Sequence, residues 1–279
     1  MAALRKAAGP AIDHKLSGPA LARAGEPPAA LAARAVSVRY GGVVALADIS
    51  LDFRSGTIEA IIGPNGAGKS TLFDALSGMR PPTSGTIYMS GHDVTSKPAV
   101  WRARHGLRRT FQRQQTFGHL SVLENLLTAQ EWRGGGGGLV GDLLGLPSRK
   151  RRQADRAGRA REVLAQCGLD HLRDASASSL TIEASRLLEL ARCLVGEPRA
   201  LLLDEPTSGM EHAAVERLGQ ILLDIRTEST CAIVLVEHNI PFVAQVSDHV
   251  TVLQLGKVIA DGDWTAIRSS PEVAAAYLG

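Results

Sequence analysis

The chain has 279 residues, of which 44% are hydrophobic and 21% charged, and a formal net charge of +3. This composition is typical of a globular protein with one or two domains, and so small a charge does not argue for a nucleic-acid partner. The cysteines Cys167, Cys193 and Cys231 lie far apart without CxxC spacing, which suggests neither a disulfide framework nor a zinc site and fits a reducing cytoplasm. Since no apolar run approaches the ~20 residues of a membrane helix, the chain is not expected to cross a bilayer by itself.

The first segment of the chain, residues 1–33, is rich in Ala, Gly, Pro and Arg. It lacks the continuous apolar core of a secretion signal, so we expect a disordered extension. From Val36 onward, short β-branched apolar runs alternate with glycines. Such runs predict strands, so residues 36–95 are expected to be mostly sheet, with one helix after Gly68.

A phosphate-binding motif lies within this sheet region. The strand-like run IEAII leads into GPNGAGKST and then into a helical pattern, LFDALSG. This is G-x-x-x-x-G-K-[ST] between a strand and a helix, a context that a glycine-rich turn with a surface lysine does not explain. The glycines let successive amides face a phosphate, the lysine neutralises the β- and γ-phosphates, and the serine hydroxyl binds Mg²⁺. The predicted ATP-binding residues are Gly63, Pro64, Asn65, Gly66, Ala67, Gly68, Lys69, Ser70 and Thr71.

The middle of the chain has a helical pattern. Between residues 101 and 188 the apolar positions recur at three and four, as in VLENLLTAQEW, which predicts a helical subdomain. Five consecutive glycines at 134–138 predict a flexible loop inside it. The basic run at 149–152 is interpreted as a solvated helix face, because no aromatic residues interleave it as in a lipid-headgroup contact.

Strand-like runs return after Leu194, in RALLLDEP, CAIVLVEH and HVTVLQLGK, with a helical pattern at 213–226 after the first. Strand, helix and strand in this order imply right-handed crossovers and a parallel sheet covered by helices. The fold class is therefore α/β. A short final helix is expected to begin at Pro271.

Three polar residues follow two of these strands. Asp204 would hold Mg²⁺ through water, and the adjacent Glu205 would polarise the attacking water as general base. Because the chain turns at Pro206, both side chains can reach one site, which a simple charged strand cap does not require. His238 ends the next strand at the same sheet edge and is a candidate γ-phosphate contact.

These motifs, in this order, resemble the ATP-binding subunits of ABC transporters over nearly all of residues 36–279. The resemblance implies a P-loop NTPase core with an antiparallel β-subdomain and an inserted helical subdomain, an ATP-binding domain over residues 34–260 and a C-terminal segment over 261–279. It also implies that Tyr40 stacks on adenine. Gln112, in RTFQ, would contact Mg²⁺ and the reacting nucleotide at the junction with the helical subdomain.

Among these subunits the chain looks most like those of importers for branched-chain amino acids or related amides such as urea. GLRRTFQRQQTFGHLSVLENLL, RLLELARCLVGEP and VEHNIPFVAQVSDHVTVL are the stretches that carry this similarity. The resemblance implies a second ATP-binding subunit, membrane permease subunits and, indirectly, a solute-binding protein. It places the chain at the cytoplasmic face of the cell membrane as a peripheral protein.

One motif departs from the family. The signature, usually LSGGQ or LSYGQ, completes the ATP site of the opposite subunit, and here it is LTIEA. Thr181 is a fair helix N-cap and Glu183 suits the first turn, but Glu183 also brings a negative charge towards the γ-phosphate. A like-charge pair ~4 Å apart costs up to about 4 kcal/mol at an effective dielectric constant near 20. The five positions are Leu180, Thr181, Ile182, Glu183 and Ala184.

The sequence therefore predicts an asymmetric heterodimer, in which ATP on this chain is hydrolysed while the partner's ATP, facing LTIEA, turns over slowly. The alternative is an ATP-binding scaffold with little hydrolysis, against which an intact Glu205 argues. A third interpretation, an ABC-type ATPase of DNA repair or translation, lacks the long heptad run or second ATP-binding domain typical of those proteins.

Overall fold

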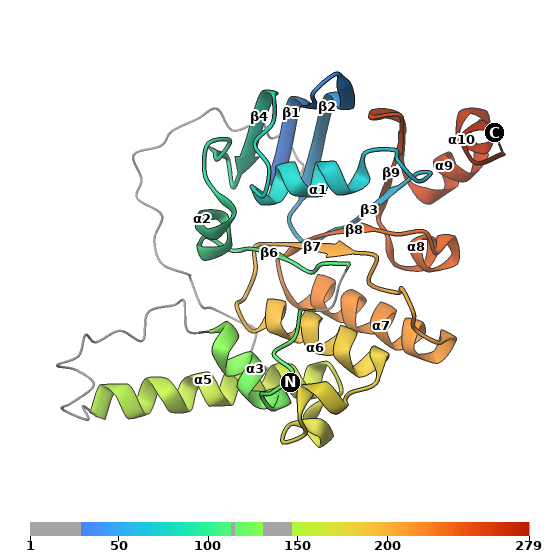
Figure 1. The fold of residues 1–279 in the computed structure, drawn as a ribbon. Coiled ribbons are helices and arrows are strands. Elements are labelled where there is room, and N and C mark those ends of the chain that lie inside the picture. The colour runs from blue at the N-terminus through green and yellow to red at the C-terminus, as the bar shows by residue number, and fades with distance from the viewer. Residues whose placement is uncertain (1–28, 113–114, 131–146, 279) are drawn as a thin grey trace. The chain divides into compact units, whose positions relative to one another are not determined.

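The computed structural model describes residues 29–112, 115–130 and 147–278 (Figure 1). The chain divides into two compact units. The first contains the residues up to Arg109 together with Arg199–Pro206 and Leu222–Gly279, and the second contains Thr110–Pro198 and Thr207–Ile221. Among the described residues, no helix has both the length and the apolar character needed to cross a membrane.

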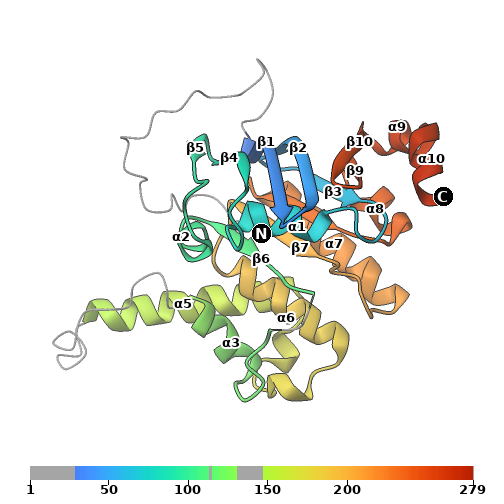
Figure 2. The same ribbon diagram turned by 45° about the horizontal axis from the view of Figure 1, so that its top comes forward.

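The first unit contains two sheets. One is antiparallel, with strand order β2-β1-β4-β5. The other has the order β10-β9-β3-β8-β7-β6, in which five strands are parallel and β10 is antiparallel at one edge (Figure 2). The strands are β1 (Ala29–Tyr40), β2 (Val43–Arg54), β3 (Ile58–Ile62), β4 (Ser84–Met89), β5 (His92–Asp93), β6 (Leu107–Arg109), β7 (Ala200–Asp204), β8 (Ala232–Val236), β9 (His249–Gln254) and β10 (Lys257–Gly262).

The core of the first unit lies around helix α1 (Lys69–Ser77). Leu72 and Phe73 of this helix are fully buried and belong to one cluster with Phe53 of the antiparallel sheet and Val234 of the parallel sheet. Strands β3, β7 and β8 are buried at every position, which is why they read as continuous apolar runs in the sequence. The other helices are α2 (Ala99–Arg104), α8 (Ile240–Val246), α9 (Trp264–Ser269) and α10 (Pro271–Leu278).

The first strand begins earlier than the sequence predicted. The disordered extension was expected to reach residue 33, but β1 starts at Ala29, and residues 30–33 are buried. Leu31 pairs with both Phe53 of β2 and Met89 of β4. Alanine is depleted in strands, so residues 29–33 show no strand pattern in the sequence. The strand is stabilised instead by its pairing with strands on both sides. Residues 1–28 of the predicted extension lie outside the described residues.

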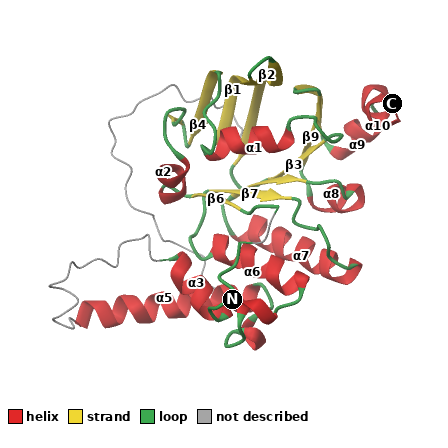
Figure 3. Cartoon of the chain, in the orientation of Figure 1, coloured by secondary structure: helices red, strands yellow, loops and turns green. Residues whose placement is uncertain are grey.

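The second unit, as far as it is described, consists of helices and connecting loops (Figure 3). Helix α3 starts with a capping box between Ser121 and Glu124. The region predicted to be helical also contains strand β6, so the prediction was wrong at these three residues, which are too few to show a period of their own. The glycine loop at 134–138 lies outside the described residues. The helices are α3 (Val122–Ala129), α5 (Pro147–Gln166), α6 (Ile182–Leu194) and the first part of α7 (His212–Glu228), which continues into the first unit, with short 3-10 turns η2 (Asp170–Leu172) and η3 (Ala177–Ser179).

A buried carboxyl group in the first unit is expected to make the stability of the folded protein depend on pH. Glu59 of β3 is 4% exposed, and its Oε1 accepts hydrogen bonds from the Arg54 amide (2.8 Å) and the Thr57 hydroxyl (3.2 Å). Burial raises the pKa of Glu59 from 4.5 to about 7, although the Arg54 amide and the charge of His249, opposite it in β9, act to lower this pKa. Folding therefore disfavours the ionised form, and this group's contribution to stability decreases as the pH rises from 4.5 through about 7.

We expect Glu59→Gln to stabilise the protein at pH 8 and to change little at pH 5, where the folded carboxyl is already protonated. The amide keeps an acceptor oxygen for Arg54 and carries no charge, so the gain at pH 8 is on the order of 2–3 kcal/mol. Thermal unfolding at both pH values measures it. Glu228→Gln, an exposed change on α7, is the control and should shift neither midpoint. An equal gain in stability at both pH values would contradict a raised pKa of Glu59 in the folded protein.

Candidate functional site

Residues 63–68 of the predicted phosphate-binding motif form the loop between β3 and α1, where the backbone favours glycine. Gly63, Gly66 and Gly68 have φ values of 149°, 78° and 104°. A Cβ on Gly63 would lie 2.1 Å from the Leu253 carbonyl oxygen, and one on Gly68 would lie 2.7 Å from that of Ala45. No side chain would therefore fit at either position.

Lys69 is the first residue of α1 and is buried. Its Nζ donates hydrogen bonds to the carbonyl oxygens of Gly63 (2.7 Å) and Pro64 (3.0 Å), so the ammonium group is held against the loop. Burial lowers the pKa of Lys69, while the charges of Glu205 and Asp204 act to raise it. Among the described residues, no side chain caps the N-terminus of α1. The loop thus combines a fixed cation with a helix N-terminus, an arrangement that suits an anion.

The two carboxylates stand at the end of β7. Asp204 is 6% exposed, and burial raises its pKa, while a hydrogen bond from Arg109 opposes this rise. Glu205 has φ 48°, in the left-handed region, and its amide donates to the Val236 carbonyl oxygen of β8 (2.9 Å). This left-handed turn ends the alternation of an extended strand, so the two adjacent side chains no longer diverge as on an extended strand.

His238 lies beside Glu205, with 3.3 Å between His238 Nε2 and Glu205 Oε1. Strands β7 and β8 are parallel neighbours in which Asp204 pairs with Val236, so the residues that follow each strand meet at one sheet edge. Glu237, which was not predicted from the sequence, holds the loop of His238. Its Oε2 accepts hydrogen bonds from the amides of His238 (3.0 Å) and Asn239 (3.2 Å). The only sequence signal for it is an acidic residue at the end of an apolar strand.

Tyr40, at the end of β1, is 42% exposed. The guanidinium carbon of Arg80 lies 3.8 Å from the centre of its ring, and Arg80 Nη2 donates to the Arg39 carbonyl oxygen (3.1 Å). One face of Tyr40 is therefore covered by a cation, an interaction that no motif in the sequence predicts.

The remaining predicted site residues, Gln112 and residues 180–184, belong to the second unit. Helix α6 begins as predicted: Thr181 is its N-cap, with Oγ1 accepting a hydrogen bond from the Ala184 amide (3.2 Å), and Glu183 is half-buried in the first turn. Arg186 of the same helix donates to the carbonyl oxygens of Phe111 (3.2 Å) and Gln112 (3.0 Å). Helix α6, through Arg186, therefore holds the main chain at Phe111 and Gln112 of the RTFQ segment.

The residues of the first unit fit a nucleoside triphosphate with Mg²⁺. The glycine loop packs too closely on the Leu253 and Ala45 carbonyls for side chains at Gly63 and Gly68, and Lys69 lies against the same loop, which fits a phosphate. Mg²⁺ is commonly bound by one or two protein oxygens together with substrate phosphates, and the Ser70 hydroxyl and Asp204 carboxylate are ligands of that kind. Glu205 and His238 lie in contact at the same sheet edge.

The chain is similar to known ATP-binding proteins over most of its length. Residues 46–208 match the ABC transporter family model. The high-affinity branched-chain amino acid transport ATP-binding protein LivG of Salmonella typhimurium is 37% identical over 249 residues, 89% of this chain and 97% of that protein. BraF of Pseudomonas aeruginosa, with the same description, is 35% identical over 244 residues, 88% of this chain and 95% of that protein.

A solved structure has the same fold. The ADP conformation of an ATP-binding cassette from an ABC transporter superposes with a TM-score of 0.77 and 27% identity, covering 90% of this chain and 99% of that one. This agrees with the predicted α/β fold of a P-loop NTPase core. With the matched motifs in place at the ends of β3, β7 and β8, the chain belongs to the ABC transporter family.

Proposed function

We propose that the chain is the subunit that binds and hydrolyses ATP to drive an importer of branched-chain amino acids. The observation that carries the proposal is the pairing of Glu205 with His238 at the sheet edge that also presents Asp204. The similarity to LivG and BraF, both named as branched-chain amino acid transport proteins, supports the substrate class.

In this proposal each residue has a separate task. Lys69 and the loop amides would bind the β- and γ-phosphates, and Ser70 and Asp204 would hold Mg²⁺, which would supply positive charge to the reacting phosphoryl group. Glu205 orients the attacking water and accepts its proton, while His238 donates a hydrogen bond to the γ-phosphate. Gln112 would complete the Mg²⁺ contacts, and Tyr40 would stack on adenine with Arg80 on its opposite face.

We further propose that the LTIEA segment makes this chain one half of an unequal pair. Glu183 lies in the first turn of α6, where the helix amides would otherwise face the phosphate of ATP on the partner. This chain would then act with a different ATP-binding subunit and with permease subunits, as a peripheral protein at the cytoplasmic face of the membrane. A second candidate, also suggested by Glu183, is an ATP-binding scaffold with little hydrolysis, against which the Glu205–His238 pair argues.

Two measurements test the proposal. Purified chain should bind ATP, and Lys69→Ala should weaken that binding by at least about tenfold, because a charge-assisted contact to phosphate is lost. The control, Lys257→Ala, removes an exposed lysine of β10 and should have no effect. Cells lacking the gene should lose uptake of radiolabelled leucine, isoleucine and valine. The wild-type gene should restore this uptake, whereas a gene carrying Glu205→Gln should not. Unchanged uptake in the deletion strain would exclude this substrate class.

A further inference from the structure

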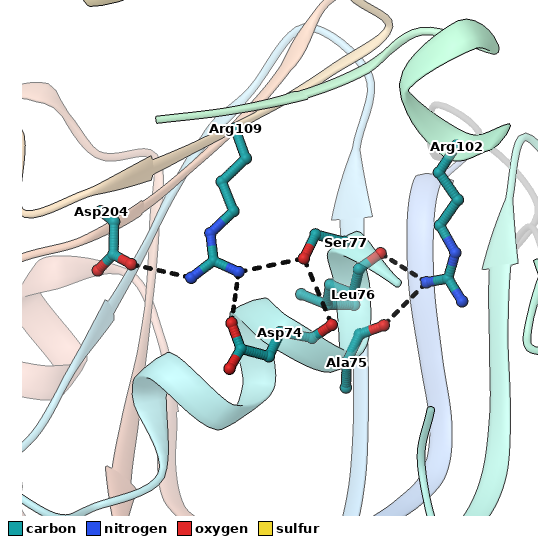
Figure 4. Close-up of polar contacts among 7 residues, drawn as sticks. All are labelled: Asp74, Ala75, Leu76, Ser77, Arg102, Arg109 and Asp204. Atoms are coloured by element: carbon teal, nitrogen blue, oxygen red, sulfur yellow. Dashed lines mark hydrogen bonds and ion pairs between the residues drawn. The ribbon is translucent and has the colours of Figure 1, made fainter. Parts of the chain in front are cut away.

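Arg109, the last residue of β6, connects two carboxylates of the first unit (Figure 4). Its side chain is 8% exposed. Nη1 donates to Asp74 Oδ1 (2.6 Å) and to Ser77 Oγ (3.1 Å), and Nη2 donates to Asp204 Oδ2 (3.1 Å). The two arms of one guanidinium group therefore contact two different elements.

These two elements carry the two side chains of this unit that are proposed to bind Mg²⁺. Asp74 belongs to α1, whose second residue is Ser70, and Asp204 is the last residue of β7. Arg109 itself is fixed in the sheet, because β6 pairs in parallel with β7 and Arg109 lies opposite Leu202. Since the guanidinium group is planar and its donors have a fixed geometry, it sets a spacing that a single flexible charge would not.

A second arginine holds the same C-terminal half of this helix. Arg102 is fully buried, and its Nη1 donates to the carbonyl oxygens of Ala75 (2.8 Å) and Leu76 (2.7 Å), while Nη2 donates to that of Val94 (2.7 Å). The C-terminal turn of α1 is thereby attached to Arg102 of α2, and Figure 4 shows the contacts of this arginine with Ala75 and Leu76. Both arginines therefore hold the C-terminal half of α1, and the contacts of Arg109 also join it to the end of β7.

We propose that Arg109 is a positioning residue that sets the spacing between Asp204 and Ser70, and with it the affinity of the nucleotide-bound chain for Mg²⁺. The inference rests on the proposed function. Mg²⁺ requires near-ideal octahedral geometry at about 2.0–2.1 Å, so a small displacement of one ligand relative to the other weakens its binding. In the opposite case, the guanidinium group competes with the metal for Asp204, and its loss tightens metal binding.

Arg109→Lys separates geometry from charge, because lysine keeps the positive charge but has no two-armed donor. The test uses the full chain with ATP. We expect metal-free ATP binding, measured in EDTA, to stay within about twofold of wild type, and the affinity of the ATP-bound chain for Mn²⁺, measured by EPR, to decrease by about tenfold. The Mn²⁺ spectrum should also change, which a purely structural role would not cause.

The matched control is Arg34→Lys, which alters the partly exposed Arg34–Asp52 pair of the antiparallel sheet and should leave Mn²⁺ affinity unchanged. If Arg109→Lys does not fold, Asp74→Ala breaks the contact on the α1 side and should weaken Mn²⁺ binding in the same direction. Unchanged or tighter Mn²⁺ binding would overturn the proposal. Wild-type protein that binds ATP neither in EDTA nor with Mg²⁺ would instead count against the proposed function.

Discussion

Glu205→Gln is expected to slow hydrolysis of the ATP bound to this chain by at least about 100-fold, because it removes the general base. Gln keeps an oxygen at the position of Oε1, 3.3 Å from His238 Nε2, so the local structure and ATP binding should survive. Single-turnover hydrolysis in the complex with its partner ATP-binding subunit measures the effect. Glu216→Gln, an exposed change on α7, is the control and should leave the rate unchanged.

The same experiment tests the proposed inequality of the two subunits. The equivalent glutamate substitution in the partner should reduce the total rate less than Glu205→Gln does, because the partner's ATP faces LTIEA. If the partner's substitution is the more damaging, the proposed asymmetry is wrong. Strong ATP turnover by this chain alone would also contradict it, since a homodimer would have two sites completed by LTIEA.

Restoring the signature is expected to raise turnover at the partner's site by about 10–100-fold, which corresponds to removing about one third to two thirds of a ~4 kcal/mol like-charge cost. The variant combines Ile182→Tyr, Glu183→Gly and Ala184→Gln. Thr181 is not changed, so helix α6 keeps its N-cap. The measurement is single-turnover hydrolysis in a complex that carries Glu205→Gln on this chain, so that only the partner's ATP reacts.

Glu183→Gln, compared with the triple variant, distinguishes the effect of charge from that of side-chain size at position 183. Glu183→Gln removes only the charge and should recover part of the gain, whereas Glu162→Gln, a change elsewhere in the same unit, should recover none. If the triple variant shows no gain, the missing glycines do not limit turnover at the partner's site.

The sequence alone predicted the features that depend on neighbouring residues. The glycines at 63 and 68 are identified by the local turn between a strand and a helix, and Asp204 and Glu205 by their place after a buried apolar run. The fully buried strands β3, β7 and β8 were read as continuous apolar segments, and this led to the α/β fold. Signals of this kind need only a few consecutive residues.

The start of β1 and the existence of strand β6 are seen only in the tertiary structure. Ala29–Ala33 has no strand preference of its own and is a strand because β2 and β4 pair with it on both sides. Leu107–Arg109 is a strand because it pairs with β7, about 90 residues later in the sequence. Neither feature has a local pattern that distinguishes it from its surroundings.

The side chains of the candidate site also divide into those that the sequence predicts and those that only the tertiary structure reveals. The sequence by itself predicts Lys69, Asp204 and Glu205 as site residues, because their chemistry is tied to short motifs. Only the tertiary structure showed that Arg109 joins Asp74 to Asp204, which lie 35 residues before it and 95 residues after it. A buried ion pair of this kind depends on the separation of two atoms in space, and that separation is set by how the sheet and helix pack, not by the order of residues along the chain.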